Sequence, residues 1–144
     1  MTIISRQAIV PYTALQMYLL VDDIAAYPSF LPWCDAAHII ERTPDEVKAT
    51  LVLVKGSIRK SFTTCNRLQS GKMIEIRLVS GPFKHLEGFW RFDDLGEKSC
   101  KVSLDLEFEF SNRLIAMALG SIFNQIAETF VQAFTKRAQD VYGK

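Results

Sequence analysis

Residues 100–110 alternate apolar and polar side chains without a break, and this pattern constrains the fold more than any other. The apolar side chains on one face are Val102, Leu104, Leu106, Phe108 and Phe110. Serine and acidic residues occupy the other face. Because successive side chains of a strand point to opposite faces, the pattern predicts a strand with one face in a core and the other in water.

The segment that follows supplies an apolar partner for this strand. Ser111 or Asn112 can cap a helix that continues to about Tyr142, because either side chain accepts from free amide groups in the first turn. Apolar residues recur in it at spacings of three and four: Ile115, Leu119, Ile122, Ile126, Phe130, Ala133 and Val141, widened by Phe123 and Phe134. We expect strand 100–110 to pack on Leu119, Ile122, Ile126 and Phe130.

The preceding residues have the pattern of an antiparallel meander. Further strands are predicted at 2–10, 36–43, 46–55, 57–68, 72–79 and 85–94, separated by short turns rich in Gly, Pro, Ser and Asp. Short helices starting at Pro11 are expected to be closed by Pro28 and Pro32, and residues 30–33 are expected to form an apolar loop. The sequence therefore predicts one α+β domain over 1–144, with a curved antiparallel sheet wrapped around a long C-terminal helix.

Composition favours an ordinary intracellular domain. The chain has 144 residues, of which 49% are hydrophobic and 23% charged. Cys34, Cys65 and Cys100 lie far apart without a C-x-x-C pair, which argues against a disulfide framework and a zinc site. No uncharged apolar run reaches the ~20 residues of a spanning helix, and the N-terminus lacks a signal-peptide pattern. We expect a cytoplasmic protein without a transmembrane segment.

The residue patterns of common enzymes are missing from the sequence. His38 and His85 belong to no metal-ligand spacing, and no P-loop, G-x-S-x-G or G-x-G-x-x-G motif follows a strand. The acidic pairs 22–23 and 93–94 consist of sequence neighbours, whose side chains diverge on regular structure. We therefore expect a binding protein with no catalytic residue, no metal ion and no catalytic cofactor.

Positive charge is concentrated between Lys55 and His85, where Glu75 is the single acidic residue. Such a run can bind RNA or a phospholipid surface, because like charges create a long-range attractive field. The candidate RNA-binding residues are Arg59, Lys60, Arg67, Lys72 and Arg77. A solvated strand face whose charges are offset by acidic neighbours fits the same pattern, and the sequence leaves both interpretations open.

Two aromatic motifs resemble those of a known family. The motifs are Tyr-Pro-Ser-Phe-Leu-Pro-Trp-Cys at 27–34 and Gly-Pro-Phe-Lys-His-Leu-Glu-Gly-Phe-Trp-Arg-Phe at 81–92. Over almost its whole length the chain resembles the coenzyme Q-binding START-type family, part of the polyketide cyclase/dehydrase and lipid transport superfamily. The resemblance implies the START-like helix-grip fold.

The resemblance also implies two functions, of which we favour the first because the aromatic motifs account for more residues than the basic segment does. The first is non-enzymatic binding of ubiquinone or a related isoprenoid lipid in an apolar tunnel between sheet and terminal helix, as a lipid chaperone in respiration. The residues expected to line this tunnel are Phe30, Leu31, Trp33, Phe83, Leu86, Trp90, Phe108, Phe123, Ile126 and Phe130. The second is that of similar bacterial toxins, described as binding the large ribosomal subunit and blocking its association with the small one. Transient contact with a membrane surface is compatible with the first.

Overall fold

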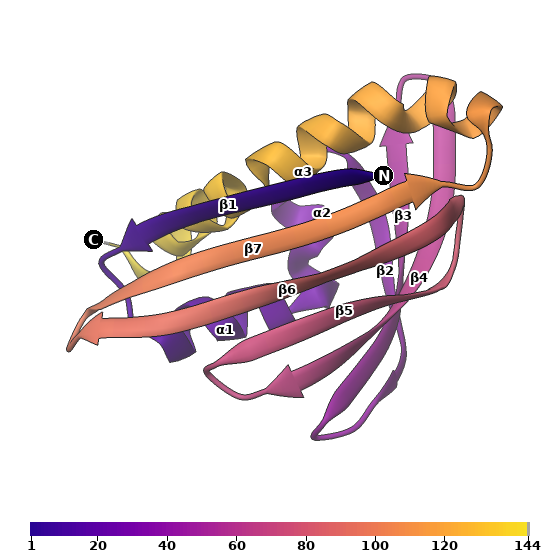
Figure 1. The fold of residues 1–144 in the computed structure, drawn as a ribbon. Helices are drawn as coiled ribbons and strands as arrows, with labels where there is room; N and C mark the ends of the chain where they lie inside the picture. Colours follow the sequence, from indigo (N-terminus) through magenta and orange to yellow (C-terminus); the bar gives the residue numbers. More distant parts are fainter. Residues whose placement is uncertain (144) are drawn as a thin grey trace.

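The computed structural model describes residues 1–143 (Figure 1). Turn residues divide this chain into the strands of one antiparallel sheet. Its strands are β1 (Thr2–Val10), β2 (Cys34–Arg42), β3 (Glu46–Lys55), β4 (Ile58–Gln69), β5 (Met73–Ser80), β6 (Phe83–Gly96) and β7 (Ser99–Phe110). From β2 to β7 each strand pairs with the next, and β1 pairs with β7 at the far edge. The predicted meander is confirmed, and β6 begins two residues earlier than expected.

Capping residues determine where the two longer helices begin. Thr13 precedes α1 (Ala14–Asp22) and forms a reciprocal capping box with Gln16, so Pro11 lies before this helix and not inside it. Asn112 accepts a hydrogen bond from the Ile115 amide at 2.9 Å and starts α3 (Arg113–Tyr142), as the sequence predicts.

The segment between α1 and β2 is more helical than expected. It contains a 3₁₀ turn, η1 (Ile24–Ala26), and a short helix, α2 (Tyr27–Phe30). Pro28 lies in the first turn of α2, where its missing N–H has no helical partner to lose. The expectation that Pro28 closes the helical segment was therefore wrong, whereas α2 does end two residues before Pro32, the second proline expected to close it.

The concave face of the sheet packs against α3, as Figure 1 shows for β1 and β7. Leu104 and Phe108 are about 1% exposed, and the Phe108 ring lies 4.7 Å from that of Phe123. The buried face of α3 consists of Leu119, Phe123, Ile126, Ala127, Val131, Phe134 and Ala138. It is rotated from the predicted stripe, because Val141 is exposed and Phe130 is half-buried. Docking of this helix on the sheet is confirmed.

By length and composition alone, α3 could cross a membrane, because an 18-residue window has a mean hydropathy of 1.4. In this fold it is the helix that the sheet grips, and seven of its side chains are buried. Its first turns expose Leu114 and Met117. These two residues support contact with a membrane surface, which remains a prediction.

The three cysteines are free thiols. Cys34 and Cys100 are buried, and burial raises the pKa of each thiol to about 11. Both therefore remain protonated near neutral pH and are poor nucleophiles, which fits a structural role in the core.

Gly88 allows β6 and β7 to approach closely. A Cβ atom at this position would lie 2.6 Å from the Asp105 carbonyl oxygen and 2.8 Å from Leu106 Cδ1. These distances are too short for non-bonded atoms, so any side chain at this position displaces β7.

We predict that Gly88→Ala lowers the free energy of unfolding by about 1–3 kcal/mol, because overpacking shifts the backbone. Urea denaturation measures this change. The matched control is Gly120→Ala in α3, where a Cβ atom meets nothing within 4 Å. Alanine at position 120 should raise stability by up to about 1 kcal/mol through helix propensity. Equal effects of the two substitutions would contradict the close approach at Gly88.

Candidate functional site

An apolar cavity of about 70 Å³ lies between the concave face of the sheet and α3. The segment between β1 and β2 contributes Val21, Ile24, Tyr27 and Trp33 to its wall. The sheet contributes Ala49, Leu51, Phe62, Thr64, Asn66, Ile76, Leu86, Trp90 and Leu106, and α3 contributes Phe123, Ile126, Ala127 and Phe130.

Two aromatic clusters hold the wall of this cavity. In the first, the ring of Phe130 lies 5.9 Å from that of Trp33 and 5.5 Å from that of Trp90. In the second, the ring of Phe123 lies 6.2 Å from that of Phe62. Aromatic pairs at these separations, edge to face or tilted, are favourable beyond the area they bury. The cavity is therefore bounded by side chains that pack firmly against one another.

Apart from the two tryptophan rings, polar side-chain atoms in the wall come from Thr64, Asn66 and Tyr27. Thr64 donates a hydrogen bond to Asn66 Oδ1 at 3.1 Å, and the Tyr27 hydroxyl donates to the Val21 carbonyl. Burial raises the pKa of Tyr27 far above its ordinary value. No wall residue therefore changes charge near neutral pH, so the wall suits an uncharged, mostly apolar ligand and offers no general acid or base.

The structure brings six of the ten predicted tunnel residues to this wall: Trp33, Leu86, Trp90, Phe123, Ile126 and Phe130. Phe83 and Phe108 are buried against Phe123 without lining the cavity. Phe30 and Leu31 flank a separate open hollow beside Pro28 and Asp35. Alternate residues of β3 and β4 face inward, and this pattern would have added Ala49, Leu51, Phe62 and Thr64 to the predicted wall residues. Whether these residues bind a ligand remains a prediction.

The cavity is smaller than the tunnel expected from the sequence. Its volume of about 70 Å³ is well below the about 300–1,000 Å³ that ligand pockets usually measure. An isoprenoid chain enters only if wall side chains move. Phe130 is a wall residue that is only half-buried.

Of the five candidate RNA-binding residues, Arg59 and Lys60 lie at one end of the sheet, Arg67 and Lys72 at the other, and Arg77 between them. Arg59 and Lys60 begin β4, whereas Arg67 lies eight residues further along, a separation of about 26 Å at the usual rise per residue. Lys72 follows β4 in the turn, and Arg77 lies on β5. The candidates therefore do not form one patch.

Acidic neighbours offset the charge of all three arginines. Arg59 pairs with Asp35 at 2.8 Å and Arg67 with Glu46 at 3.6 Å. Arg77 pairs with Glu75 at 2.9 Å, and the hydrogen bond and charge of Glu75 raise the pKa of Arg77. The charges of the arginines in this run are thus offset by acidic residues on β2, β3 and β5.

The β3–β4 hairpin end, which comprises Lys55, Arg59 and Lys60, keeps an excess of positive charge. All three side chains are exposed, and Asp35 is their one ion-pair partner within residues 1–143. Lys55 and Lys60 form no ion pair in this described part of the chain. This end is the more suitable of the two for binding an anionic surface.

Residues 10–135 match the family model described as polyketide cyclase / dehydrase and lipid transport. The chain belongs to this family. The crystal structure of the Zhui aromatase/cyclase from Streptomyces shares the fold with a TM-score of 0.84 at 15% identity, and the match covers 96% of this chain and 93% of the other. The solution structure of CC1736 from Caulobacter crescentus is 30% identical with a TM-score of 0.76, and both chains are covered completely. The START-like helix-grip fold predicted from the sequence is confirmed.

Curated relatives share the family and differ in their names. The ribosome association toxin RatA of Escherichia coli K12 is 48% identical over 96% of this chain and 88% of its own length. RatA of Pseudomonas aeruginosa is 45% identical over 99% of both chains. The mitochondrial coenzyme Q-binding protein COQ10 homolog B of Xenopus laevis is more distant, at 25% identity over 97% of this chain and 59% of its own. The comparisons therefore favour the ribosomal alternative over quinone binding.

We predict that Phe130→Ala lowers the free energy of unfolding by about 2–4 kcal/mol, because it removes a ring from the centre of the first aromatic cluster. Denaturant titration checks the value. Phe89→Ala is the matched control, since Phe89 lies on the outer face of β6 under Arg91 and should cost less than about 1 kcal/mol. Equal losses would show that Phe130 does not anchor the cavity wall.

Proposed function

We propose that this protein associates with the large ribosomal subunit, hinders its joining to the small one, and contacts ribosomal RNA through the β3–β4 hairpin end. The observation that carries the proposal is the set of relatives named ribosome association toxin, at 45–48% identity over 96–99% of this chain. A cytoplasmic location follows from such a function.

The charge distribution supports this choice of surface. RNA binding draws much of its free energy from counterions released when Lys and Arg neutralise phosphates. Lys55 and Lys60 are free to bind phosphates in this way, whereas Arg67 and Arg77 must first give up Glu46 and Glu75. Of the basic residues between Lys55 and His85, those at the hairpin end therefore gain most from binding a phosphate.

Charge reversal tests the proposed surface. Lys55→Glu with Lys60→Glu should lower cosedimentation with purified large subunits at least tenfold. It should also reduce the slope of log affinity against log salt by about two, because two side chains no longer neutralise phosphates. The matched control is Lys98→Glu with Lys136→Glu, which changes the net charge equally at exposed positions elsewhere.

Two results would contradict the proposal. Equal reductions in the two double variants would show an effect of net charge without a defined surface. Binding of the unmodified protein that does not respond to salt would show that phosphate neutralisation does not drive association.

The apolar cavity favours a second candidate function, which is non-enzymatic binding of an apolar ligand of the isoprenoid quinone class. Its wall is formed mainly by aliphatic and aromatic side chains, and Thr64 and Asn66 provide one polar spot. Burial of apolar area would supply the affinity at about 25 cal/mol per Å², less the cost of association. The absence of an acid–base group from this wall supports binding without catalysis.

Extraction and mass spectrometry test the second candidate. We expect a quinone or other isoprenoid lipid in protein purified from a quinone-containing host, and saturable binding of added ubiquinone. Ala127→Leu should weaken quinone binding by filling the cavity and leave ribosome cosedimentation intact. The Lys55/Lys60 double variant should weaken ribosome cosedimentation and leave quinone binding intact. No extracted lipid together with no saturable binding would exclude the carrier function.

A further inference from the structure

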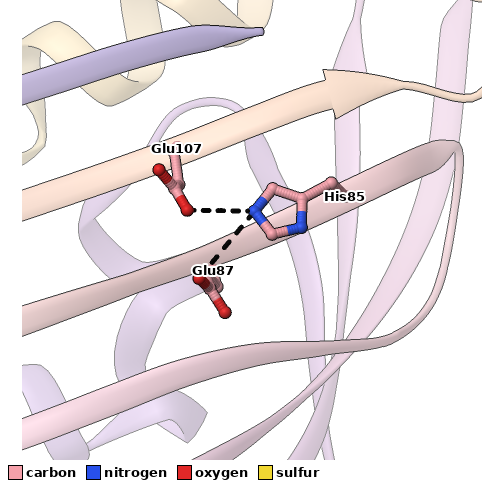
Figure 2. Close-up of side chains that lie close together, drawn as sticks. All are labelled: His85, Glu87 and Glu107. Carbon is pink, nitrogen blue, oxygen red and sulfur yellow. Dashed lines mark hydrogen bonds and ion pairs between the residues drawn. The ribbon is translucent and has the colours of Figure 1, made fainter.

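Three side chains with metal-ligating atoms converge on the outer face of the sheet, away from the cavity. They are His85 and Glu87 of β6 and Glu107 of β7, and Figure 2 shows the imidazole directed at both carboxylates. His85 Nε2 lies 3.2 Å from Glu107 Oε1 and 3.9 Å from Glu87 Oε1. One ligand atom from each residue lies within 4.8 Å of the other two.

Strand register explains this convergence. Glu87 and Glu107 are direct cross-strand partners, and His85 precedes Glu87 by two residues on the same face. A register shift between Phe83 and His85 allows Phe83 to point inward while His85 points outward. Spacing along the chain did not reveal the cluster, because Glu107 is twenty residues from Glu87 and only the β6–β7 pairing unites them.

Neither carboxylate forms an ion pair with a lysine or an arginine within residues 1–143. Like charges directly opposite one another destabilise a strand pair. Arg77 on β5 is the cross-strand partner of Glu87 and its charge interacts with that of Glu87, but its Nε donates a hydrogen bond to Glu75 at 2.9 Å. The other nearby cations are also engaged, Lys84 with Glu109 at 3.7 Å and Arg91 with Asp105 at 3.8 Å. Within residues 1–143, His85 is the one ion-pair partner of the two carboxylates, and a neutral imidazole does not offset their charge.

We propose that His85, Glu87 and Glu107 form a binding site for a divalent transition-metal ion of the zinc class. Zinc bonds of about 2.0–2.1 Å in a tetrahedron place neighbouring ligand atoms about 3.3 Å apart. The His85–Glu107 distance already matches this value, and the half-exposed Glu87 side chain closes the remaining gap by small rotations. An imidazole nitrogen among the donors favours zinc over magnesium or calcium.

Three protein ligands leave one tetrahedral position open to water, because the cluster lies on the solvent side of the sheet. The bound ion neutralises the opposed carboxylates and links β6 to β7. Since it binds the folded chain better than the unfolded one, it also raises the melting temperature.

Calorimetric titration of metal-free protein with zinc chloride tests the site, with magnesium chloride as the comparison ion. We expect one zinc ion per chain, a zinc-dependent rise in melting temperature, and no saturable binding of magnesium. His85→Ala and Glu107→Gln should each weaken zinc binding at least tenfold. Both positions are on the surface, and melting curves without zinc verify that the variants fold.

Matched variants separate this site from other zinc-binding groups. His38→Ala removes the other histidine, which is exposed on β2, and Cys65→Ser removes the thiol that is not fully buried. Both variants should bind zinc like the unmodified protein. No saturable zinc binding, undiminished binding by the His85 and Glu107 variants, or a reduction confined to Cys65→Ser would each overturn the proposal.

Discussion

Packing between the inner face of β7 and the buried face of α3 is the interaction on which the rest of the structure depends. Phe108 and Phe123 meet at its centre, with ring centroids 4.7 Å apart. This contact holds the long helix along the concave side of the sheet and creates the space between them. The aromatic clusters and the cavity wall exist only because α3 stays in this position.

The two candidate functions use different parts of the fold. The cavity lies inside the fold and has no group that titrates near neutral pH, so it suits a neutral apolar ligand. The β3–β4 hairpin end is exposed and positively charged, so it suits an anionic surface. Because the sites share no residue, one chain can retain an apolar ligand in the cavity while associating with a ribosome.

Local patterns predicted the fold well, whereas long-range contacts decided the sites. Alternation along 100–110 predicted β7, and a capping residue predicted the start of α3 at Asn112. Sequence patterns did not reveal that Glu46 offsets Arg67, since this depends on the register of β3 against β4, whereas Glu75 lies two residues from Arg77 on the same strand. The cavity wall was only partly predicted for the same reason, because its β3 and β4 residues become neighbours of α3 only through sheet curvature. The aromatic motifs predicted the family correctly. They favoured quinone binding over the ribosomal function, whereas the comparisons favour the ribosomal function.

The central claim is that this protein acts on the ribosome through its surface at the β3–β4 hairpin end. Cryo-electron microscopy of the protein bound to purified large ribosomal subunits tests it most directly. The account predicts density for the sheet with Lys55, Arg59 and Lys60 against ribosomal RNA. Density that places this hairpin in solvent, with the protein bound by another face, would contradict the account, as would the failure to form any complex at low salt.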